Sequence, residues 1–224
     1  MKKNEVRFRI EEIGIIPAVR LSSADDALFA VEAVASGGIP IVEVTMTVPG
    51  ALEVIENLAH NRPGVIVGAG TVLDIEAARR CLGAGAMFLT STGLDLEMVD
   101  FAVKQEVVVF PGVLTPTEVM MASKAGADFV KIFPCSQLGG PAYIKALKAP
   151  FPQVPLIASG GVNQRTAADF IVAGAVAVGI GGDLIQPDAI KCRERDWIRE
   201  LAHRCVWQVF SAHFGSLIWP TLSD

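Results

Sequence analysis

The sequence holds few of the residues that metal and redox chemistry require. Only three of its 224 residues are histidine, and its four cysteines form no CxxC pair. This inventory offers no zinc-cluster or dithiol motif, so we expect neither a bound metal ion nor a cofactor. The cysteines are expected to be buried thiols rather than disulfides. They are Cys81, Cys135, Cys192 and Cys205.

Positive charge and long apolar runs are also scarce. The formal net charge is -5, which gives no basic surface for nucleic acid or an anionic membrane. Gly, Pro or charged residues interrupt each apolar stretch before the length of about 20 residues that a membrane span needs. The opening residues, MKKNEVRFRIEE, are too charged for the apolar part of a signal peptide. We therefore expect a cytoplasmic protein that binds neither nucleic acid nor membrane.

What the sequence does contain is a repeat of about 22 residues, in which an apolar strand, a turn, an amphipathic helix and a small-residue turn follow one another. Capping residues or proline open the helical stretches, as in SSADDALFAVEAVA, TPTEVMMASK and NQRTAADFIV. Glycine follows them, as in SGGIP and AGADF. Eight strands are predicted, over residues 15–20, 41–46, 65–71, 87–92, 107–113, 129–134, 155–161 and 175–182.

Eight strand–helix units predict an α/β protein with one (β/α)8 TIM-barrel domain over residues 1–224. An extra N-terminal helix is expected near residues 3–13. A doubly wound open sheet is the alternative, which the number of repeats disfavours. The tail, residues 205–224, is unusually apolar for a chain end, and we expect it to cap the bottom of the barrel or to meet a neighbouring subunit.

Two predicted strands carry a charged residue where a charge is costly. Side chains alternate along a strand, so Lys131 in FVKIFP and Glu43 in IVEVTM face away from their branched aliphatic neighbours. In a barrel the aliphatic face packs against the helices, which puts both charges inside. A buried charge costs several kcal/mol unless it is paired. The two residues are either a structural ion pair or part of an active site near the C-terminal mouth of the barrel.

A lysine and a carboxylate inside a barrel are suited to one particular chemistry. Burial favours the neutral, nucleophilic form of a lysine amine, which can condense with a substrate carbonyl to form a Schiff base. The protonated imine is an electron sink, so a neighbouring carbon–carbon bond can break without a metal, while a carboxylate carries protons. Phe133 lies on the same face as Lys131. A histidine-based site is hard to assemble, because the histidines lie outside the strand ends: His60, His203 and His213.

Glycine-rich runs close the seventh and eighth predicted strands. They are ASGG at residues 158–161 and GIGGD at residues 179–183. Many barrels bind phosphate at these two strands through backbone N–H groups. Gly160, Gly161 and Gly182 are therefore candidate contacts for a substrate anion. Asp183 fits this interpretation poorly, because a carboxylate repels phosphate.

Several motifs resemble one family of enzymes over roughly residues 10–200. They are EVTMTVPGALEVI, VGAGTV, PGVLTPTEVMMA, VKIFPCSQLGGPAYIKALKAPFP and SGGV. Together they are similar to the 2-keto-3-deoxy-6-phosphogluconate (KDPG) and 4-hydroxy-2-oxoglutarate aldolases. The resemblance implies a class I, Schiff-base, trimeric (β/α)8 enzyme. It also implies reversible cleavage of a 2-keto-4-hydroxy acid to pyruvate and an aldehyde, which is glyceraldehyde 3-phosphate if the substrate is KDPG.

The resemblance also implies roles for individual residues. Lys131 matches the imine-forming lysine and Glu43 the general acid and base. Thr71 and Phe133 match positions that line the pyruvate pocket. Gly160 and Gly161 match the phosphate-contacting turn.

The sequence departs from the family pattern at the substrate-binding positions. Thr47 stands where some members have an arginine that grips the substrate, so Arg20 becomes the candidate for the substrate carboxylate. Thr92 replaces a proline of some members, and Asp183 replaces a phosphate-binding serine. These changes leave Lys131 and Glu43 in place. They leave open whether the distal group of the substrate is a phosphate, a carboxylate or a hydroxyl.

Two other functions fit a barrel of this kind. The first is a phosphate-binding isomerase or epimerase, which would use carboxylates rather than a lysine at the strand ends. The second is a non-catalytic barrel that binds a ligand or assembles with partners. The lysine on the sixth strand disfavours the first, and the intact pair of Lys131 and Glu43 disfavours the second.

Overall fold

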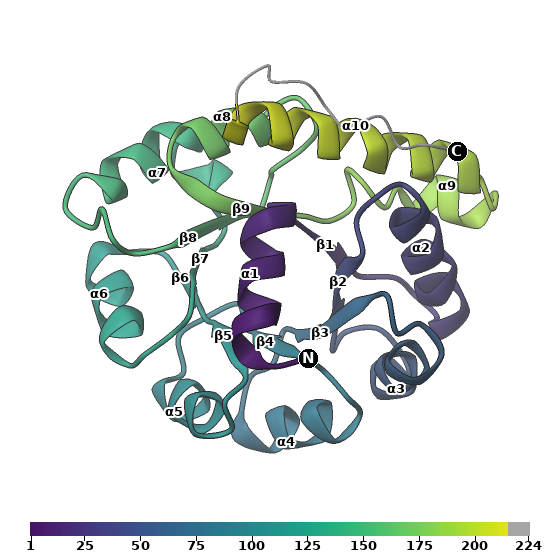
Figure 1. Ribbon diagram of the computed structural model, residues 1–224, viewed down its shortest axis with the longest axis horizontal. Helices are drawn as coiled ribbons and strands as arrows, with labels where there is room; N and C mark the ends of the chain where they lie inside the picture. The colour runs from purple at the N-terminus through teal and green to yellow at the C-terminus, as the bar shows by residue number, and fades with distance from the viewer. Residues whose placement is uncertain (215–224) are drawn as a thin grey trace.

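The protein is a parallel β-barrel surrounded by helices in the computed structural model, which describes residues 1–214 (Figure 1). Every strand pairing is parallel, and the order around the sheet is β5-β4-β3-β2-β1-β9-β8-β7-β6. The strands are β1 (Ile15–Val19), β2 (Ile41–Thr45), β3 (Ile66–Gly70), β4 (Phe88–Thr90), β5 (Val108–Phe110), β6 (Gly112–Val113), β7 (Val130–Ile132), β8 (Leu156–Ser159) and β9 (Ala175–Ile180).

Pro111 divides the fifth predicted strand into β5 and β6. Proline has no N–H to give to a ladder, but its carbonyl still accepts a hydrogen bond from the Lys131 N–H at 3.0 Å. β5 pairs with β4 and β6 pairs with β7, so this one segment joins the two sides of the sheet. The predicted barrel is confirmed, with nine assigned strands in place of eight. The single domain over residues 1–224 stays a prediction.

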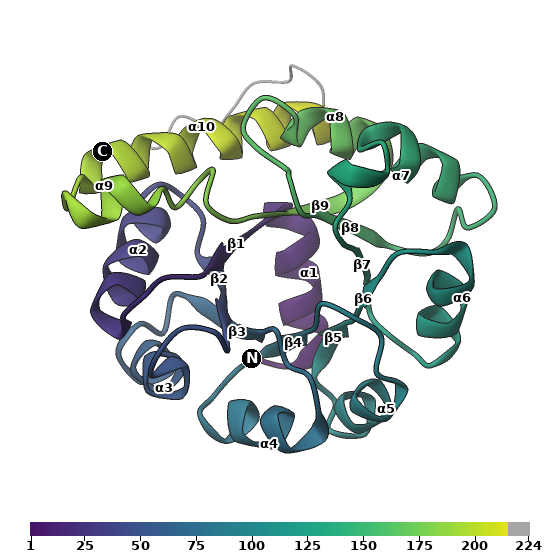
Figure 2. The same cartoon turned by 180° about the vertical axis from the view of Figure 1, so that it is seen from behind.

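All the helices except α1 form a ring outside the strands, and the ring is seen from both ends of the barrel in Figures 1 and 2. The helices are α1 (Lys3–Ile13), α2 (Ala24–Ser36), α3 (Ala51–Asn61), α4 (Ile75–Gly83), α5 (Leu96–Lys104), α6 (Pro116–Lys124), α7 (Pro141–Lys148), α8 (Ala167–Val172), α9 (Pro187–Lys191) and α10 (Arg195–Phe214). None of the helices in the described part of the chain has the length and apolar character needed to cross a membrane.

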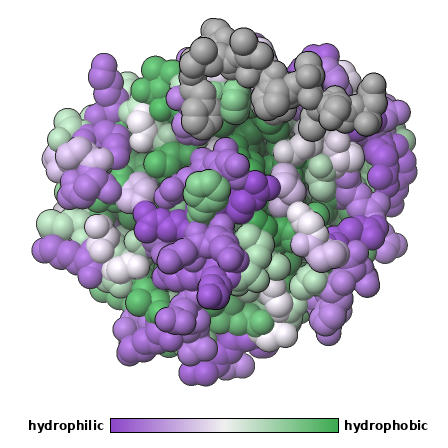
Figure 3. Space-filling view, viewed as in Figure 1, coloured by the Kyte–Doolittle hydropathy of each residue, from purple (hydrophilic) through white to green (hydrophobic). Residues whose placement is uncertain are grey.

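The extra N-terminal helix is confirmed as α1, which lies across one end of the barrel (Figure 1). Val6 and Ile10 bury their side chains beneath it, and Lys3 pairs with Asp128, just before β7, at 3.0 Å. These contacts place α1 over the N-terminal ends of the strands. The middle of this face, where α1 lies, is mostly hydrophilic (Figure 3). The C-terminal ends of the strands, which carry the predicted site, are at the opposite end.

Side-chain caps open α2, α4, α5 and α6. The Ser23 side chain accepts the Asp26 N–H at the start of α2, and Thr115 forms a capping box with Glu118 at the start of α6. The helical stretch predicted in NQRTAADFIV forms, but only in its second part, as α8. Asn163 instead accepts the Arg165 N–H at 3.0 Å, and this local turn delays α8 to residues 167–172.

Residues 205–214 of the apolar tail belong to α10, whereas residues 215–224 lie outside the described residues. Helix α10 packs along α2 and α8 on the outside of the barrel. Gly37 permits a close approach there, because a Cβ at this position would lie 2.5 Å from the Arg199 carbonyl oxygen. It is α1, and not this part of the tail, that lies across the barrel end.

Aromatic rings fill the barrel below the predicted site. The Phe88 and Phe110 rings stack with centroids 5.3 Å apart, and Phe129 meets Phe110 edge to face at 6.1 Å. Gly68 makes room for this layer, since a Cβ there would lie 2.2 Å from the Phe88 ring. Phe129 precedes Lys131 by two residues on the same face of the chain. The charged pair therefore lies above a packed apolar layer.

Candidate active site

Lys131 on β7 and Glu43 on β2 meet across the barrel interior. The Lys131 Nζ atom lies 3.3 Å from Glu43 Oε2 and 3.4 Å from Oε1. Their side chains are only 6% and 4% exposed, so the prediction that both face inward is confirmed. Each charge compensates the other, as a buried charge requires. Pairing alone fits a structural role as well as a catalytic one.

A cavity beside the pair favours a catalytic role. Its volume is about 210 Å³, and Lys131, Glu43, Phe133 and Thr92 are among the residues that line it. The Lys131 Nζ atom lies 5.7 Å from the centroid of the Phe133 ring, within the range of a cation–π contact. A purely structural ion pair has no need of an adjoining space for a ligand. This cavity lies where barrel enzymes keep their chemistry, at the C-terminal ends of the strands.

The glycine turn after β8 forms another part of the cavity wall. Gly160 and Gly161 have φ angles of +87° and +79°, and Cβ atoms there would lie 2.8 Å from Pro134 and 2.6 Å from Ser136. Both the backbone conformation and the space therefore require glycine. Within residues 1–214, the N–H groups of Gly160, Gly161 and Val162 have no acceptor, which leaves them available to a ligand.

The structure brings five of the seven predicted substrate-binding residues to the cavity. They are Arg20, Phe133, Gly160, Gly161 and Gly182.

The other two, Thr47 and Thr71, are not part of the cavity wall. The Thr47 hydroxyl lies 2.8 Å from that of Thr45, which donates to the Val19 carbonyl. Thr71 has a φ of +58°, an unusual conformation for a β-branched residue. Its buried Oγ1 atom has no hydrogen-bonding partner in the described part of the chain. It follows Gly70, where a Cβ would lie 2.0 Å from Glu43 Oε1, so the end of β3 adjoins the pair of Lys131 and Glu43.

Sequence reasoning missed Ser159 and Val162, which also line the cavity. Ser159 is 7% exposed and ends β8 within the ASGG run. The signal was available, because Ser159 directly precedes Gly160 and Gly161 in the sequence. Val162 follows them and offers no polar group that could have drawn attention.

Cys135 lies beside this site in sequence but behaves as a packed thiol. Burial raises the pKa of the Cys135 thiol to about 12, so it stays protonated and is no nucleophile at neutral pH. Its Sγ atom lies 3.8 Å from the Gly140 carbonyl oxygen. Within residues 1–214, no three His, Cys, Asp or Glu side chains gather in a way that could hold a metal ion.

Fold and site together define a parallel β/α-barrel enzyme with a lysine–carboxylate pair in its mouth. The chain belongs to the KDPG and KHG aldolase family, whose family model matches residues 6–201. Membership places it among the carbon–carbon lyases. A 2-dehydro-3-deoxy-phosphogluconate aldolase of Pseudomonas aeruginosa is 34% identical over 203 residues, which cover 90% of this chain and 91% of the relative.

Solved structures of similar proteins agree with this family assignment. KDPG aldolase from Legionella pneumophila, captured with pyruvate as a covalent carbinolamine intermediate, is 31% identical with a TM-score of 0.82. The match covers 88% of this chain and 96% of that one. A second neighbour, also 31% identical, is a cube-shaped cage designed by fusing symmetric oligomeric domains. Its TM-score is 0.81, and the match covers 90% of this chain and 73% of that one.

Proposed function

We propose that the protein is a class I aldolase that cleaves a 2-keto-4-hydroxy acid of the KDPG type to pyruvate and an aldehyde, reversibly and through a Schiff base. The observation that carries this proposal is the buried pair of Lys131 and Glu43, 3.3 Å apart, beside a cavity at the strand ends. Two relatives support a substrate of this type, because the Pseudomonas aeruginosa and Legionella pneumophila proteins are KDPG aldolases.

Lys131 supplies the covalent step of the proposed reaction. Its neutral amine attacks the keto carbon of the substrate, and the carbonyl oxygen takes up a proton to give a carbinolamine. Loss of water from this adduct leaves a protonated imine. Glu43 is placed to move the protons, because its carboxylate oxygens lie 3.3 and 3.4 Å from the nitrogen that forms the imine.

The imine then accepts the electrons of the breaking bond. The Glu43 carboxylate removes the proton of the C4 hydroxyl, the C3–C4 bond breaks, and the aldehyde leaves. The bonding electrons pass to the imine and give an enamine, which Glu43 protonates at C3. Hydrolysis of the resulting imine releases pyruvate and restores the Lys131 amine. These reaction steps require no metal, because the protonated imine carries the positive charge that accepts the bonding electrons.

The remaining residues have proposed roles in holding the substrate. The Thr71 hydroxyl is buried without a partner in residues 1–214, one residue beyond Gly70, so it adjoins the pyruvate end of the site from outside the cavity wall. Phe133 packs against the pyruvate carbons, and Arg20 offers a guanidinium to the substrate carboxylate. Thr47 acts through Thr45, because the hydroxyl oxygens of the two residues lie 2.8 Å apart. Gly160, Gly161 and Gly182 adjoin the distal group.

Borohydride reduction in the presence of pyruvate tests the proposal directly. We expect intact mass and peptide mapping to show one reduced pyruvate adduct on Lys131. The variant Lys131→Met should form none, and the matched variant Lys145→Met, altered at an exposed lysine of α7, should form it normally. A folded protein without an adduct would contradict the aldolase proposal and favour an isomerase, an epimerase or a non-catalytic barrel.

We further propose that the protein assembles as a homotrimer. The resemblance of its motifs to trimeric enzymes supports this assembly. So does its similarity to a designed cage made from symmetric oligomeric domains.

A further inference from the structure

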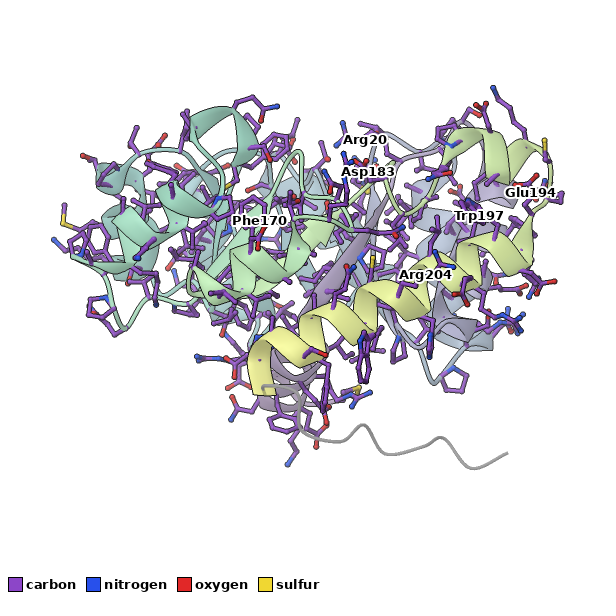
Figure 4. All side chains as sticks on the ribbon, turned by 90° about the horizontal axis from the view of Figure 1, so that it is seen from above. Arg20, Phe170, Asp183, Glu194, Trp197 and Arg204 are labelled. Carbon is purple, nitrogen blue, oxygen red and sulfur yellow. The ribbon has the colours of Figure 1, made fainter. Side chains whose placement is uncertain are left out.

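The distal part of the cavity has a carboxylate where barrels commonly bind phosphate. The loops after the seventh and eighth strands of the repeat form this region, and in the structure they follow β8 and β9. Asp183 comes from the second of these loops and lines the cavity beside Gly182. Arg20, from the end of β1, lines the same cavity. Figure 4 shows Arg20 and Asp183 at the same edge of the molecule.

The ionisable groups of the cavity wall cancel in formal charge. They are two cations, Lys131 and Arg20, and two anions, Glu43 and Asp183. A 2-keto acid brings one negative charge of its own, and a phosphate group adds about 1.5 to 2 more at neutral pH. This wall therefore has no surplus of positive charge for a phosphorylated substrate.

Asp183 is also free to bind a ligand. Within residues 1–214, its carboxylate has no hydrogen-bonding or ion-pairing partner, and the guanidinium of Arg20 has none either. Asp183 and Arg20 are thus not joined in a salt bridge that would neutralise the carboxylate. An ionised carboxylate only accepts hydrogen bonds, so a group that satisfies it must be a donor. A sugar hydroxyl is such a donor, and a phosphate dianion is not.

We infer that Asp183 is a specificity-determining residue that selects substrates whose distal end carries hydroxyl groups and disfavours those that end in phosphate. The inference rests on the proposed aldolase function and names its substrate class: unphosphorylated 2-keto-3-deoxy sugar acids. The free N–H groups of Gly160, Gly161 and Val162 can donate to a hydroxyl oxygen as well as to a phosphate oxygen. These N–H groups do not distinguish a hydroxyl end from a phosphate end, so the charge of Asp183 determines which substrate is preferred.

The size of the effect follows from Coulomb's law. For charges roughly 6 Å apart at a partly exposed site, repulsion between Asp183 and a phosphate corresponds to roughly a 10- to 100-fold loss in kcat/KM. Removal of the charge should recover that factor for the phosphorylated aldehyde. Removal of the acceptor should lower activity with the unphosphorylated aldehyde, which loses a hydrogen bond to an ionised group.

The test compares condensation of pyruvate with D-glyceraldehyde and with D-glyceraldehyde 3-phosphate. We expect the ratio of kcat/KM values to shift toward the phosphorylated aldehyde by at least roughly 10-fold in Asp183→Ser, since both effects act in the same direction. Asp188→Ser is the matched control, since its side chain is 98% exposed on α9 and does not line the cavity. It should leave the ratio unchanged. A ratio in Asp183→Ser within threefold of that of the unmodified enzyme would overturn the inference.

Borohydride trapping of pyruvate alone separates this inference from the proposed function. Trapping uses no aldehyde, so Asp183→Ser should form the Lys131 adduct as readily as the unmodified enzyme. A normal adduct with an unchanged aldehyde ratio would overturn only the role of Asp183. An unmodified enzyme that forms no adduct would overturn both.

Discussion

Lys131 and Glu43 have separable roles in the proposed reaction, although they form one buried ion pair. The lysine nitrogen makes and breaks a covalent bond, whereas the carboxylate only transfers protons. Loss of the nitrogen removes the pathway altogether. Loss of the carboxylate leaves a slow pathway through water, so substitutions at the two positions should differ in degree.

Glu43→Gln tests the proton-transfer role. The amide keeps the size of the side chain but cannot act as a base, so we expect kcat to fall by roughly 10²- to 10⁴-fold. Exchange of the pyruvate methyl protons with deuterated water should slow by a similar factor, since the same carboxylate serves the enamine carbon. NMR of pyruvate follows the exchange, and a coupled assay follows cleavage.

Glu76→Gln is the control for this substitution, because Glu76 is exposed in the first turn of α4. It should leave both rates within about twofold, as surface substitutions usually do. Circular dichroism of the Glu43→Gln protein would show that the fold is kept. A folded Glu43→Gln enzyme with an undiminished proton exchange rate would rule out the role assigned to Glu43.

At the scale of strands and helices, local patterns are what the sequence determines best. The inward orientation of Lys131 and Glu43 follows from side-chain alternation, which depends only on neighbours along the strand. The caps at Ser23 and Thr115 are equally local. By contrast, whether Thr47 reaches the cavity depends on Thr45, whose hydroxyl donates to the Val19 carbonyl of another strand.

Loop residues likewise depend on contacts that the local sequence does not determine. Threonine does not favour the left-handed backbone conformation that Thr71 adopts, so tertiary contacts impose it. The Pro111 break in the fifth strand could have been predicted, since proline removes one ladder donor. The position of the Asp183 carboxylate could not have been predicted, because the path of a loop depends on packing against residues that are distant in sequence.

The capping box of α6 offers a prediction about stability and pH. Glu118 Oε2 accepts hydrogen bonds from the Thr115 hydroxyl and from the N–H groups of Thr115 and Leu114, at 2.8, 2.7 and 3.0 Å. The Thr115 side-chain bond, followed by the two backbone bonds, lowers the pKa of Glu118 below its usual value. A lowered carboxyl pKa means that the stabilisation is present above the unfolded-state pKa and is lost as the pH falls through the folded-state value.

We therefore expect Glu118→Ala to lower the free energy of unfolding by about 1 kcal/mol at pH 7, as loss of a cap typically does. Urea titrations from pH 7 to pH 3 should show this penalty shrink in acid. Glu97→Ala is the matched control: Glu97 is exposed in the first turn of α5, and its side chain has no hydrogen-bonding partner within residues 1–214. Equal penalties for the two variants, or a penalty for Glu118→Ala that grows in acid, would contradict this account.

At the scale of the whole molecule, the barrel separates stability from chemistry. Helix α1 and the layer of Phe88, Phe110 and Phe129 occupy the N-terminal part, whereas the cavity opens at the other end. Substitutions in the distal wall of the cavity can therefore change specificity at little cost in folding. Asp183 is exposed and far from the aromatic layer, which is why its substitution is a clean test of substrate choice.

The proposed homotrimer leads to a prediction about mass and stoichiometry. Several large apolar side chains are exposed in the described structure, among them Leu73 at 62% and Leu96 at 41%, and assembly would remove such surface from water. Light scattering after size exclusion should give three times the mass of one chain. Lys131 and Glu43 belong to the same chain, so borohydride trapping should give one pyruvate adduct for each chain of the trimer. The mass of one chain across a dilution series would refute the trimer, whereas fewer adducts than chains in a fully folded sample would show that the sites are not independent.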